Sequence, residues 1–464
     1  MKNTDNTVGY YGALTTLLLS SFMATLAVSS VNILLPELVV SLNTNYANAQ
    51  WVSISYMILL SSTLVLGGRL SDIYGQRKLF IIGTIIFTLS AGLCGLSQNV
   101  WTLSAFRALQ GVGAAILVAV NLAMVREISP RHKMNMAMGL MGSLSAIGTA
   151  TGPIVGGFIA NATDWNTTFF INIPLGFTVL LMAIRYLPKT TKFATAERKT
   201  FDYLGAMLLF LVVLGYSLFL KHSIRAPMLV STALLGLTLI SLLMFIRQQN
   251  STKYPLLNLS IVRDYRFSLS FIVNFMVSTA VMTSLVIGPF YLTVALNLNI
   301  SAAGLVMATS PIFVAITSFI IGRTLIEKNT SSTVTIGLLL LTTGTTLFAN
   351  LDISFGVLGY IACLAFTAIG YGTFTSSNNT QIMNLVTSNQ GGQVSGLLNL
   401  SRNLGLLTGA TLMSALFELN THTSVTGTFT AKLAELGLNR VYVVATVLLC
   451  IALVLRLHQQ YRGK

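Results

Sequence analysis

The sequence predicts an all-α membrane protein that crosses the bilayer many times, built from two six-helix bundles with two inserted helices. Three observations predict this class. Hydrophobic residues make up 54% of the 464 residues and charged residues only 8%, whereas soluble proteins carry about 25% charged residues. Long apolar runs alternate with short polar connections, and several residues of the first part recur at one constant spacing in the second part.

Fourteen apolar runs are long enough to span a bilayer, which requires about 20 helical residues. They are expected near residues 12–35, 50–67, 79–97, 102–125, 134–160, 167–187, 202–220, 227–246, 267–291, 301–322, 333–350, 355–377, 391–417 and 438–457. An even number of spans places both ends of the chain on one side. Because only Lys2 precedes the first run as a basic residue, we expect a retained helix rather than a cleaved signal segment.

The basic residues predict the orientation. If the polar stretch 67–78 is cytoplasmic, the segments 126–133, 185–201, 247–266 and 323–332 are cytoplasmic too. Together with the two tails they hold 21 of the 27 lysines and arginines. Because Lys and Arg accumulate on the cytoplasmic side of membrane proteins, we expect both termini in the cytoplasm. The net charge of +15 is then explained by this excess of Lys and Arg on the cytoplasmic side, and it does not indicate a surface that binds nucleic acid.

The stretch 67–78 carries Asp72 between basic residues, with glycines at 67, 68 and 75. Charges of this density do not lie in lipid, so we expect a tight cytoplasmic connection that glycine allows to turn. Asp72 would hold a gate shut by pairing with basic residues and with a helix N-terminus. The expected gate loop contains Gly68, Asp72, Gly75, Arg77 and Lys78.

An internal repeat predicts the two bundles. Five residues recur after a constant offset of 257: Gly113, Asn121, Gly139, Gly148 and Gly152 match Gly370, Asn378, Gly396, Gly405 and Gly409. A repeat of this length predicts that the two parts of the chain form related bundles around a central site. We therefore expect a first bundle over 1–190, an inserted helix pair over 191–250 and a second bundle over 251–464.

Three motifs resemble those of the major facilitator superfamily. Residues 68–78 resemble the signature G-x-L-[AS]-D-x-x-G-x-[RK]-[RK], and Leu103, Arg107, Gln110, Gly111 and Gly113 resemble L-x-x-x-R-x-x-Q-G-x-G. Residues 148–157 resemble the antiporter signature g-x-x-x-G-P-x-x-G-G, and Asn172-Ile-Pro-Leu-Gly176 is similar to the fourteen-helix drug:proton antiporter branch. The resemblance covers essentially the whole chain. It implies the major facilitator fold, with fourteen membrane helices, and multidrug efflux.

The antiporter motif has a physical interpretation of its own. Gly148, Gly152 and Gly156 recur every four residues, which places them on one helix face, and Pro153 bends the helix. A face of small residues lets another helix approach closely. Tight packing alone explains this pattern, and only the resemblance implies an antiporter.

The chain departs from that branch at one position. The branch carries an acid in the first helix, and here Ala27 takes its place. Glu37, at the outer end of this helix, is the first candidate to replace the acid, because it could pair with Arg107 and its protonation would then be tuned by burial and charge. The alternative is an exposed glutamate at the membrane surface. Together with Asp72 of the cytoplasmic stretch, Glu37 and Arg107 are the residues expected to take part in proton coupling.

Polar side chains inside the spans predict a central cavity between the bundles. Its expected residues are Asn32, Arg107, Asn121, Asn378, Asn379, Arg402 and Met276. Two buried arginines with few buried acids favour anionic, zwitterionic or neutral substrates, unless Arg402 only pairs with carbonyls. Flexible methionines adapt to different ligands, and Met276, Met282 and Met307 with Phe271, Phe275, Phe290 and Tyr291 are candidates for such a wall, or simply pack.

The expected function is proton-coupled export of small amphipathic compounds across the cytoplasmic membrane by a monomer, a form of antibiotic resistance. One alternative is a dedicated exporter of an anionic or zwitterionic metabolite, such as a siderophore or fatty acid. Another is a receptor or assembly subunit that does not transport. No metal cluster, cofactor motif or enzyme site appears in the sequence. The outer segment 418–437 is predicted to form a small β-hairpin or a disordered loop.

Overall fold

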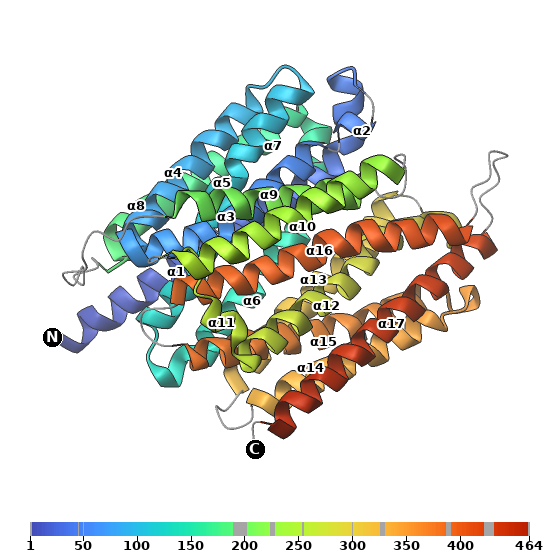
Figure 1. Ribbon diagram of the computed structural model, residues 1–464. Helices are drawn as coiled ribbons and strands as arrows, with labels where there is room; N and C mark the ends of the chain where they lie inside the picture. Colours follow the sequence, from blue (N-terminus) through green and yellow to red (C-terminus); the bar gives the residue numbers. More distant parts are fainter. Residues whose placement is uncertain are drawn as a thin grey trace.

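The computed structural model describes residues 2–44, 46–49, 51–188, 202–222, 228–252, 255–298, 300–324, 330–386, 391–421 and 431–462, and these residues form helices and short connections without a strand. The first bundle contains α1 (Lys2–Ser41), α3 (Trp51–Tyr74), α4 (Gln76–Gly95), α5 (Val100–Ile128), α6 (Met134–Ala162) and α8 (Asn172–Tyr186), with the short helices α2 (Tyr46–Ala49), η1 (Arg131–Lys133) and α7 (Trp165–Phe170). In Figure 1 most of this bundle lies in the upper and left parts of the molecule.

The second bundle contains α12 (Tyr265–Phe290), α13 (Ile300–Thr324), α14 (Thr330–Ala349), α15 (Gly356–Leu385), α16 (Gly391–Thr421) and α17 (Ala431–Arg462). Three short helices accompany them: α11 (Leu259–Arg263), the π-helix η2 (Tyr291–Ala295) and η4 (Ile353–Phe355). Thirteen described helices are long and apolar enough to cross a membrane. α16, which coincides with the predicted span 391–417, is not among the thirteen, and its first half carries the polar residues Gln393, Asn399, Arg402 and Asn403.

The two bundles repeat one packing scheme, as the internal repeat predicts. α1 packs on α6 as α12 packs on α16, and α4 packs on α5 as α14 packs on α15. Three of the repeated glycine pairs lie at these contacts: Gly113 with Gly370, Gly148 with Gly405, and Gly152 with Gly409. A Cβ at Gly148 would lie 2.7 Å from the carbonyl oxygen of Phe22 in α1, and a Cβ at Gly405 would meet the carbonyl oxygen of Phe275 in α12. The repeat at offset 257 is thus confirmed as a structural one.

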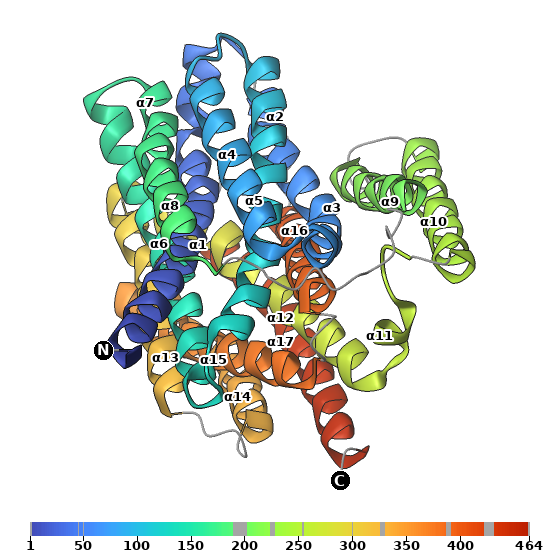
Figure 2. The ribbon, with the colours of Figure 1, turned by 90° about the vertical axis from the view of Figure 1, so that its left-hand side faces the viewer.

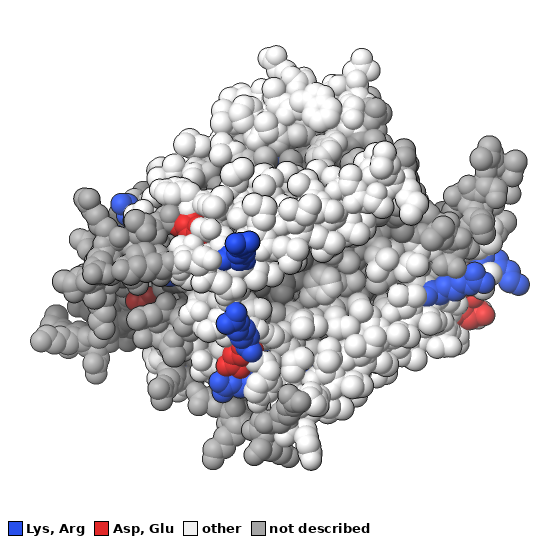
Figure 3. Space-filling model, in the orientation of Figure 1, with Lys and Arg blue, Asp and Glu red and all other residues white. Residues whose placement is uncertain are grey.

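The inserted helices α9 (Tyr203–His222) and α10 (Met228–Ser251) lie outside the two bundles. Figure 2 shows the pair standing to one side. α9 packs on α3 and α16, whereas α10 packs mainly on α9. Met228, Leu229 and Leu243 of α10 are exposed by 83%, 80% and 67%. Apolar exposure on this scale suits a surface that faces lipid, and Figure 3 shows a band without charged residues between charged groups at both ends of the face in view.

The prediction that residues 67–78 form a loop is wrong, because almost all of them are helical. α3 continues as a helix through Asp72 to Tyr74, and α4 begins at Gln76. Only Gly75 interrupts the helix, with a φ of 93° that favours glycine. The charges keep this segment out of lipid but do not prevent helix formation, because the backbone groups still bond within the helix. The chain therefore turns at Gly75 between two continuous helices.

The predicted hairpin lies partly outside the described residues. α16 extends to Thr421 and α17 starts at Ala431, so both flanks of the segment 418–437 are helical rather than extended. Residues 422–430, which contain most of the alternating threonines, are not described.

Candidate functional site

The two bundles meet mainly through two pairs of helices, α6 with α13 and α3 with α16. Glycine makes both approaches close. A Cβ at Gly139 of α6 would lie 2.6 Å from the Cα of Gly322 in α13, and a Cβ at Gly396 of α16 would lie 2.8 Å from the carbonyl oxygen of Leu64 in α3. The Ser143 hydroxyl also donates a hydrogen bond of 2.7 Å to the carbonyl oxygen of Ala315 across the first pair.

These close contacts concentrate toward one end of the molecule. We call it the basic end and define it by Gly75, the start of α6 and the ends of α5 and α15. Arg126, near the end of α5, donates from Nε to the carbonyl oxygen of Met383 over 3.0 Å and from a terminal nitrogen to that of Val386. Because the last carbonyls of a helix lack partners within it, this arginine of the first bundle caps α15 of the second.

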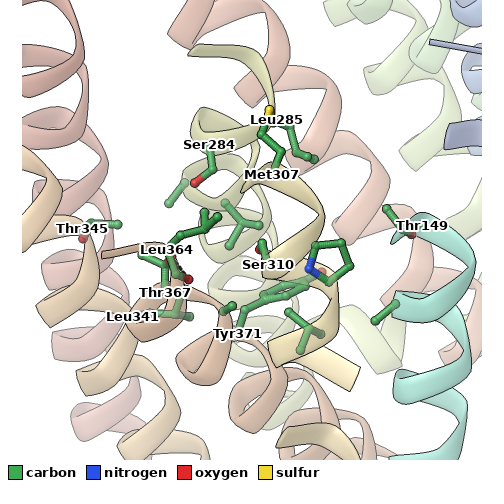
Figure 4. A pocket seen from close by; sticks show the side chains of 16 residues that line it. Thr149, Ser284, Leu285, Met307, Ser310, Leu341, Thr345, Leu364, Thr367 and Tyr371 are labelled. Atoms are coloured by element: carbon green, nitrogen blue, oxygen red, sulfur yellow. Dashed lines mark hydrogen bonds between the residues drawn. The ribbon is translucent and has the colours of Figure 1, made fainter. Parts of the chain in front are cut away.

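A cavity of about 110 Å³ lies where α6 meets the second bundle. Figure 4 shows Thr149 of α6 on one side and Ser284, Ser310, Thr367 and Tyr371 of the second bundle on the other. The full lining comprises Ala146, Thr149, Ala280, Val281, Ser284, Leu285, Met307, Ser310, Pro311, Val314, Leu341, Thr345, Leu364, Thr367, Ala368 and Tyr371. None of these lining side chains is charged, so the cavity suits an uncharged group.

Arg107 is buried to 1% exposure in the first bundle and does not line this cavity. Its guanidinium lies 4.2 Å from the ring centre of Tyr56 and donates to the side-chain oxygen of Gln110 over 2.6 Å. A second, longer hydrogen bond of 3.4 Å joins its Nε to the carbonyl oxygen of Val52. An ion pair with Glu37 is not among the contacts of the described residues.

Glu37 lies half-buried near the C-terminal end of α1. Burial raises the pKa of its carboxyl group, and the carboxylate of Asp164 raises that pKa further. Asp164 precedes α7, which packs on α1. The structure thus places a second acid near Glu37 where the sequence suggested an arginine.

The other predicted cavity residues do not line this cavity. Asn121 is buried and accepts a hydrogen bond of 3.1 Å from the Ser20 hydroxyl, which joins α5 to α1. Asn378 is buried, and its Nδ2 finds no hydrogen-bond partner among the described residues. The same holds for the Nε of half-buried Arg402. Met276 packs against the core of the second bundle.

Of the remaining predicted residues, Asn379 is half-buried, and the side chains of Asn32, Asp72 and Pro153 are not described. Arg77 donates to the carbonyl oxygen of Ile184 in α8 and thereby holds α4 to α8, whereas Lys78 is exposed.

The glycines of the antiporter motif lie against α1. A Cβ at Gly152 would overlap the hydroxyl of Ser29, and that hydroxyl also donates to the carbonyl oxygen of Gly148 over 3.2 Å. Gly156, one turn further, is buried. The small-residue face thus permits close approach of two helices within the first bundle, as its spacing predicts.

Sequence reasoning missed most of the cavity. Met307 lines it and belongs to the methionines considered for an adaptable wall. The hydroxyl residues Thr149, Thr345 and Thr367 give no signal in the sequence, because threonine is common throughout the spans. Pro311 inside α13 is a usable signal, since a proline interrupts the hydrogen bonding of a helix at this depth.

Comparisons with known proteins agree with this architecture. The family model described as Major Facilitator Superfamily matches residues 17–410. The riboflavin transporter RibZ of Clostridioides difficile (strain 630) is 30% identical over 85% of this chain and 86% of its own. The uncharacterized transporter YebQ of Escherichia coli (strain K12) is 29% identical over 88% of this chain and 89% of its own.

The chain is also similar to a multidrug transporter and, in fold, to a solved transporter structure. The multidrug transporter protein MdtP of Bacillus subtilis (strain 168) is 23% identical over 87% of this chain and 75% of its own. The crystal structure of the human organic anion transporter MFSD10 (TETRAN) superposes with a TM-score of 0.68 at 15% identity, covering 95% of this chain and 99% of that one. At this identity the likeness concerns the fold alone. The family match over most of the chain, together with the paired bundles, shows that this protein belongs to the Major Facilitator Superfamily of membrane transporters.

Proposed function

We propose that this transporter exports small amphipathic compounds across the cytoplasmic membrane in exchange for protons. The observation that carries the proposal is the uncharged cavity at the junction of α6 with the second bundle. A ligand held there touches both bundles, and rocking of one bundle against the other would change the side to which it is exposed.

The proposed cycle follows from the contacts at the basic end. If this end faces the cytoplasm, as the distribution of Lys and Arg favours, the present conformation is closed toward the cytoplasm. Opening would then separate Gly139 from Gly322 and remove Arg126 from the end of α15. No soluble domain is required for such a cycle, and we propose that a monomer performs it.

The proposed substrates are amphipathic because the cavity combines apolar side chains with hydroxyl groups. The similarity to a multidrug transporter of Bacillus subtilis supports this class. Accumulation assays in a host that lacks its own efflux pumps test it. We expect lower accumulation of uncharged amphipathic dyes when the protein is produced, and unchanged accumulation of every dye would contradict export.

We propose that Glu37 carries the coupled proton, with Asp164 as its neighbour. A raised pKa lets a carboxyl group bind a proton at the mildly acid pH outside an energised cell. In vesicles with an imposed pH gradient, Glu37→Gln should abolish proton-driven substrate movement while facilitated movement down a substrate gradient continues. Intact proton-driven movement in this variant would refute the assignment.

A second candidate is a dedicated exporter of one anionic or zwitterionic metabolite. Arg402 favours it, because its Nε is buried without a hydrogen-bond partner among the described residues. The similarity to a riboflavin transporter is compatible with a dedicated substrate. Transport of anionic but not cationic dyes, lost in Arg402→Ala, would favour this candidate over multidrug efflux.

A further inference from the structure

The cavity extends into the second bundle beyond its junction with α6. Leu341 and Thr345 of α14 line its far side, and α14 packs behind α15. Figure 4 shows Thr345 on the side opposite to Thr149 of α6. The cavity therefore penetrates the bundle and is not merely a groove between the two halves.

The size of the cavity limits its ligand. An apolar cavity of about 150 Å³ in another protein holds benzene, so a cavity of about 110 Å³ accepts about one ring. Larger compounds would place one ring inside and leave the remainder at the junction with α6.

The hydroxyl groups of the cavity determine which ring it prefers. The Thr367 hydroxyl donates to the carbonyl oxygens of Cys363 and Leu364, at 3.1 and 2.8 Å. The Thr345 hydroxyl donates to the carbonyl oxygen of Thr342 over 3.0 Å. A hydroxyl has one hydrogen and two lone pairs. With their hydrogens directed to their own helices, both threonines offer a ligand only acceptor oxygens.

Two further features of the lining concern hydrogen bonding. Ser284 and the buried Tyr442 hydroxyl bond to each other over 2.8 Å, so part of their capacity is already used. Pro311 has no N–H group. The carbonyl oxygen of Met307, four residues earlier, therefore lacks the hydrogen bond that a helix normally provides. Both Met307 and Pro311 line the cavity. Ser310 and Tyr371 add hydroxyl groups that can donate as well as accept, so acceptor oxygens outnumber donor hydrogens in the wall.

We propose that this cavity binds an uncharged aromatic ring that carries a hydrogen-bond donor, such as a phenol or an indole, with the donor directed to Thr367 or Thr345. Burial without a charged lining residue excludes carboxylates and ammonium groups, since an unpaired charge is costly in such surroundings. This inference refines the substrate class of the proposed exporter and rests on that proposed function.

The test uses equilibrium dialysis of the purified protein in lipid nanodiscs, with empty nanodiscs as the blank. The probes are 2-naphthol, 2-methoxynaphthalene without a donor, the anion 2-naphthoate and protonated 2-(aminomethyl)naphthalene. We expect 2-naphthol to bind most tightly and the two charged probes at least about tenfold more weakly. Equal or tighter binding of a charged probe would overturn the proposal.

Substitutions locate the binding site. Thr367→Val and Thr345→Val preserve the shape of each side chain and remove the acceptor oxygen. Loss of one hydrogen bond should weaken 2-naphthol binding about fivefold and leave 2-methoxynaphthalene unaffected. Thr343→Val is the matched control, because Thr343 lies on the exposed face of α14. If neither cavity variant differs from this control while both remain folded, the proposal fails.

The binding test does not depend on transport. Donor-selective binding that Thr367→Val weakens, without any transport, would leave this inference standing and contradict the proposed export. Transport of amphipathic dyes together with unselective binding would support the proposed export and contradict this inference. The two hypotheses therefore fail in different experiments.

Discussion

Arg107 belongs to the motif that resembles the superfamily's arginine motif, and Ala27 stands where the resemblance implies an acid in the first helix. A buried cation without an anion requires compensation from dipoles and rings. Here the Tyr56 ring lies beneath the guanidinium at 4.2 Å, and Gln110 accepts one hydrogen bond. Tyr56 thus supplies part of the stabilisation that a carboxylate would otherwise provide.

This role of Tyr56 predicts an asymmetry between two substitutions. Its hydroxyl finds no hydrogen-bond partner among the described residues, so Tyr56→Phe should preserve stability. Tyr56→Leu removes the ring and should cost about 2 kcal/mol, the value of a desolvated cation–π contact. Thermal unfolding in detergent measures both. Equal destabilisation by Phe and Leu would show that the hydroxyl and not the ring supports Arg107.

The glycine face of α6 predicts a steric effect. A Cβ at Gly148 would meet backbone atoms of Phe22, which cannot move aside as a side chain can. Gly148→Val should therefore destabilise the protein by about 1–3 kcal/mol, the usual range for overpacking. Gly236→Val in α10 is the control, because nothing lies within 4 Å of a Cβ there. The midpoint of thermal unfolding should fall only in the first variant.

At the scale of elements, apolar length and the glycine repeat were sufficient to predict the helices and their division into two bundles. The stretch 67–78 shows where this reasoning stops. Hydropathy marks where lipid ends but not where a helix ends, so the helical segment from Gly68 to Tyr74 looked like a loop. The positive φ of Gly75 marks the true break, and a sequence with three nearby glycines does not reveal which one turns the chain.

The cavity was less predictable than the fold. Its lining comes from α6, α12, α13, α14 and α15, and it combines ordinary threonines, serines and alanines with larger apolar residues. Sequence reasoning instead selected asparagines and arginines, because polar groups in a membrane span are costly and attract attention. Asn121 shows the weakness of that criterion, since its side chain accepts a hydrogen bond from Ser20 of α1.

The cap formed by Arg126 predicts a conformational effect. Hydrogen bonds of a charged group contribute about 1.5–3 kcal/mol, and about 1.4 kcal/mol changes an equilibrium tenfold. Arg126→Gln should thus raise about tenfold the population of the conformation in which the two bundles are separated at the basic end. The measurement is maleimide labelling of Ser318→Cys, a buried position at the α6–α13 contact, in a chain without its three native cysteines.

Arg185→Gln serves as the matched control for that experiment. Arg185 lies in the last turn of α8 at the same end of the molecule, and its guanidinium lies near the Tyr186 ring of its own helix. Removing this charge changes the net charge equally but breaks no contact between the bundles among the described residues. Faster labelling in both variants would mean that charge and not the cap controls the opening.

At the scale of the whole molecule, the paired packing scheme has a mechanical consequence. The contacts α6–α13 and α3–α16 exchange places under the repeat that relates the bundles. Each bundle is held internally by close glycine contacts, such as Gly113 against Phe87 in the first and Gly370 against Leu341 in the second. Motion is therefore expected between the bundles, where few polar contacts must break, and not within them.

Under the proposed function, proton coupling would act on that whole-molecule motion from the C-terminal end of α1, and its pH dependence has a definite sign. Burial raises the pKa of Glu37 first, and the Asp164 carboxylate raises it further. The proton is thus bound at a higher pH than for an isolated glutamate, and it is released as the pH rises through the raised pKa. Asp164→Asn removes one of the two causes, so the midpoint of the external-pH profile should move to lower pH.

Transport in right-side-out vesicles at a series of external pH values, with fixed internal pH, measures this midpoint. Asp352→Asn provides the control, because it removes the same charge from an exposed acid in the second bundle, where Asp352 caps η4. Glu37→Gln should give a profile without this midpoint, since no proton binds there. A shift to higher pH in Asp164→Asn, or an equal shift in Asp352→Asn, would refute the pairing of Glu37 with Asp164 as the proton site.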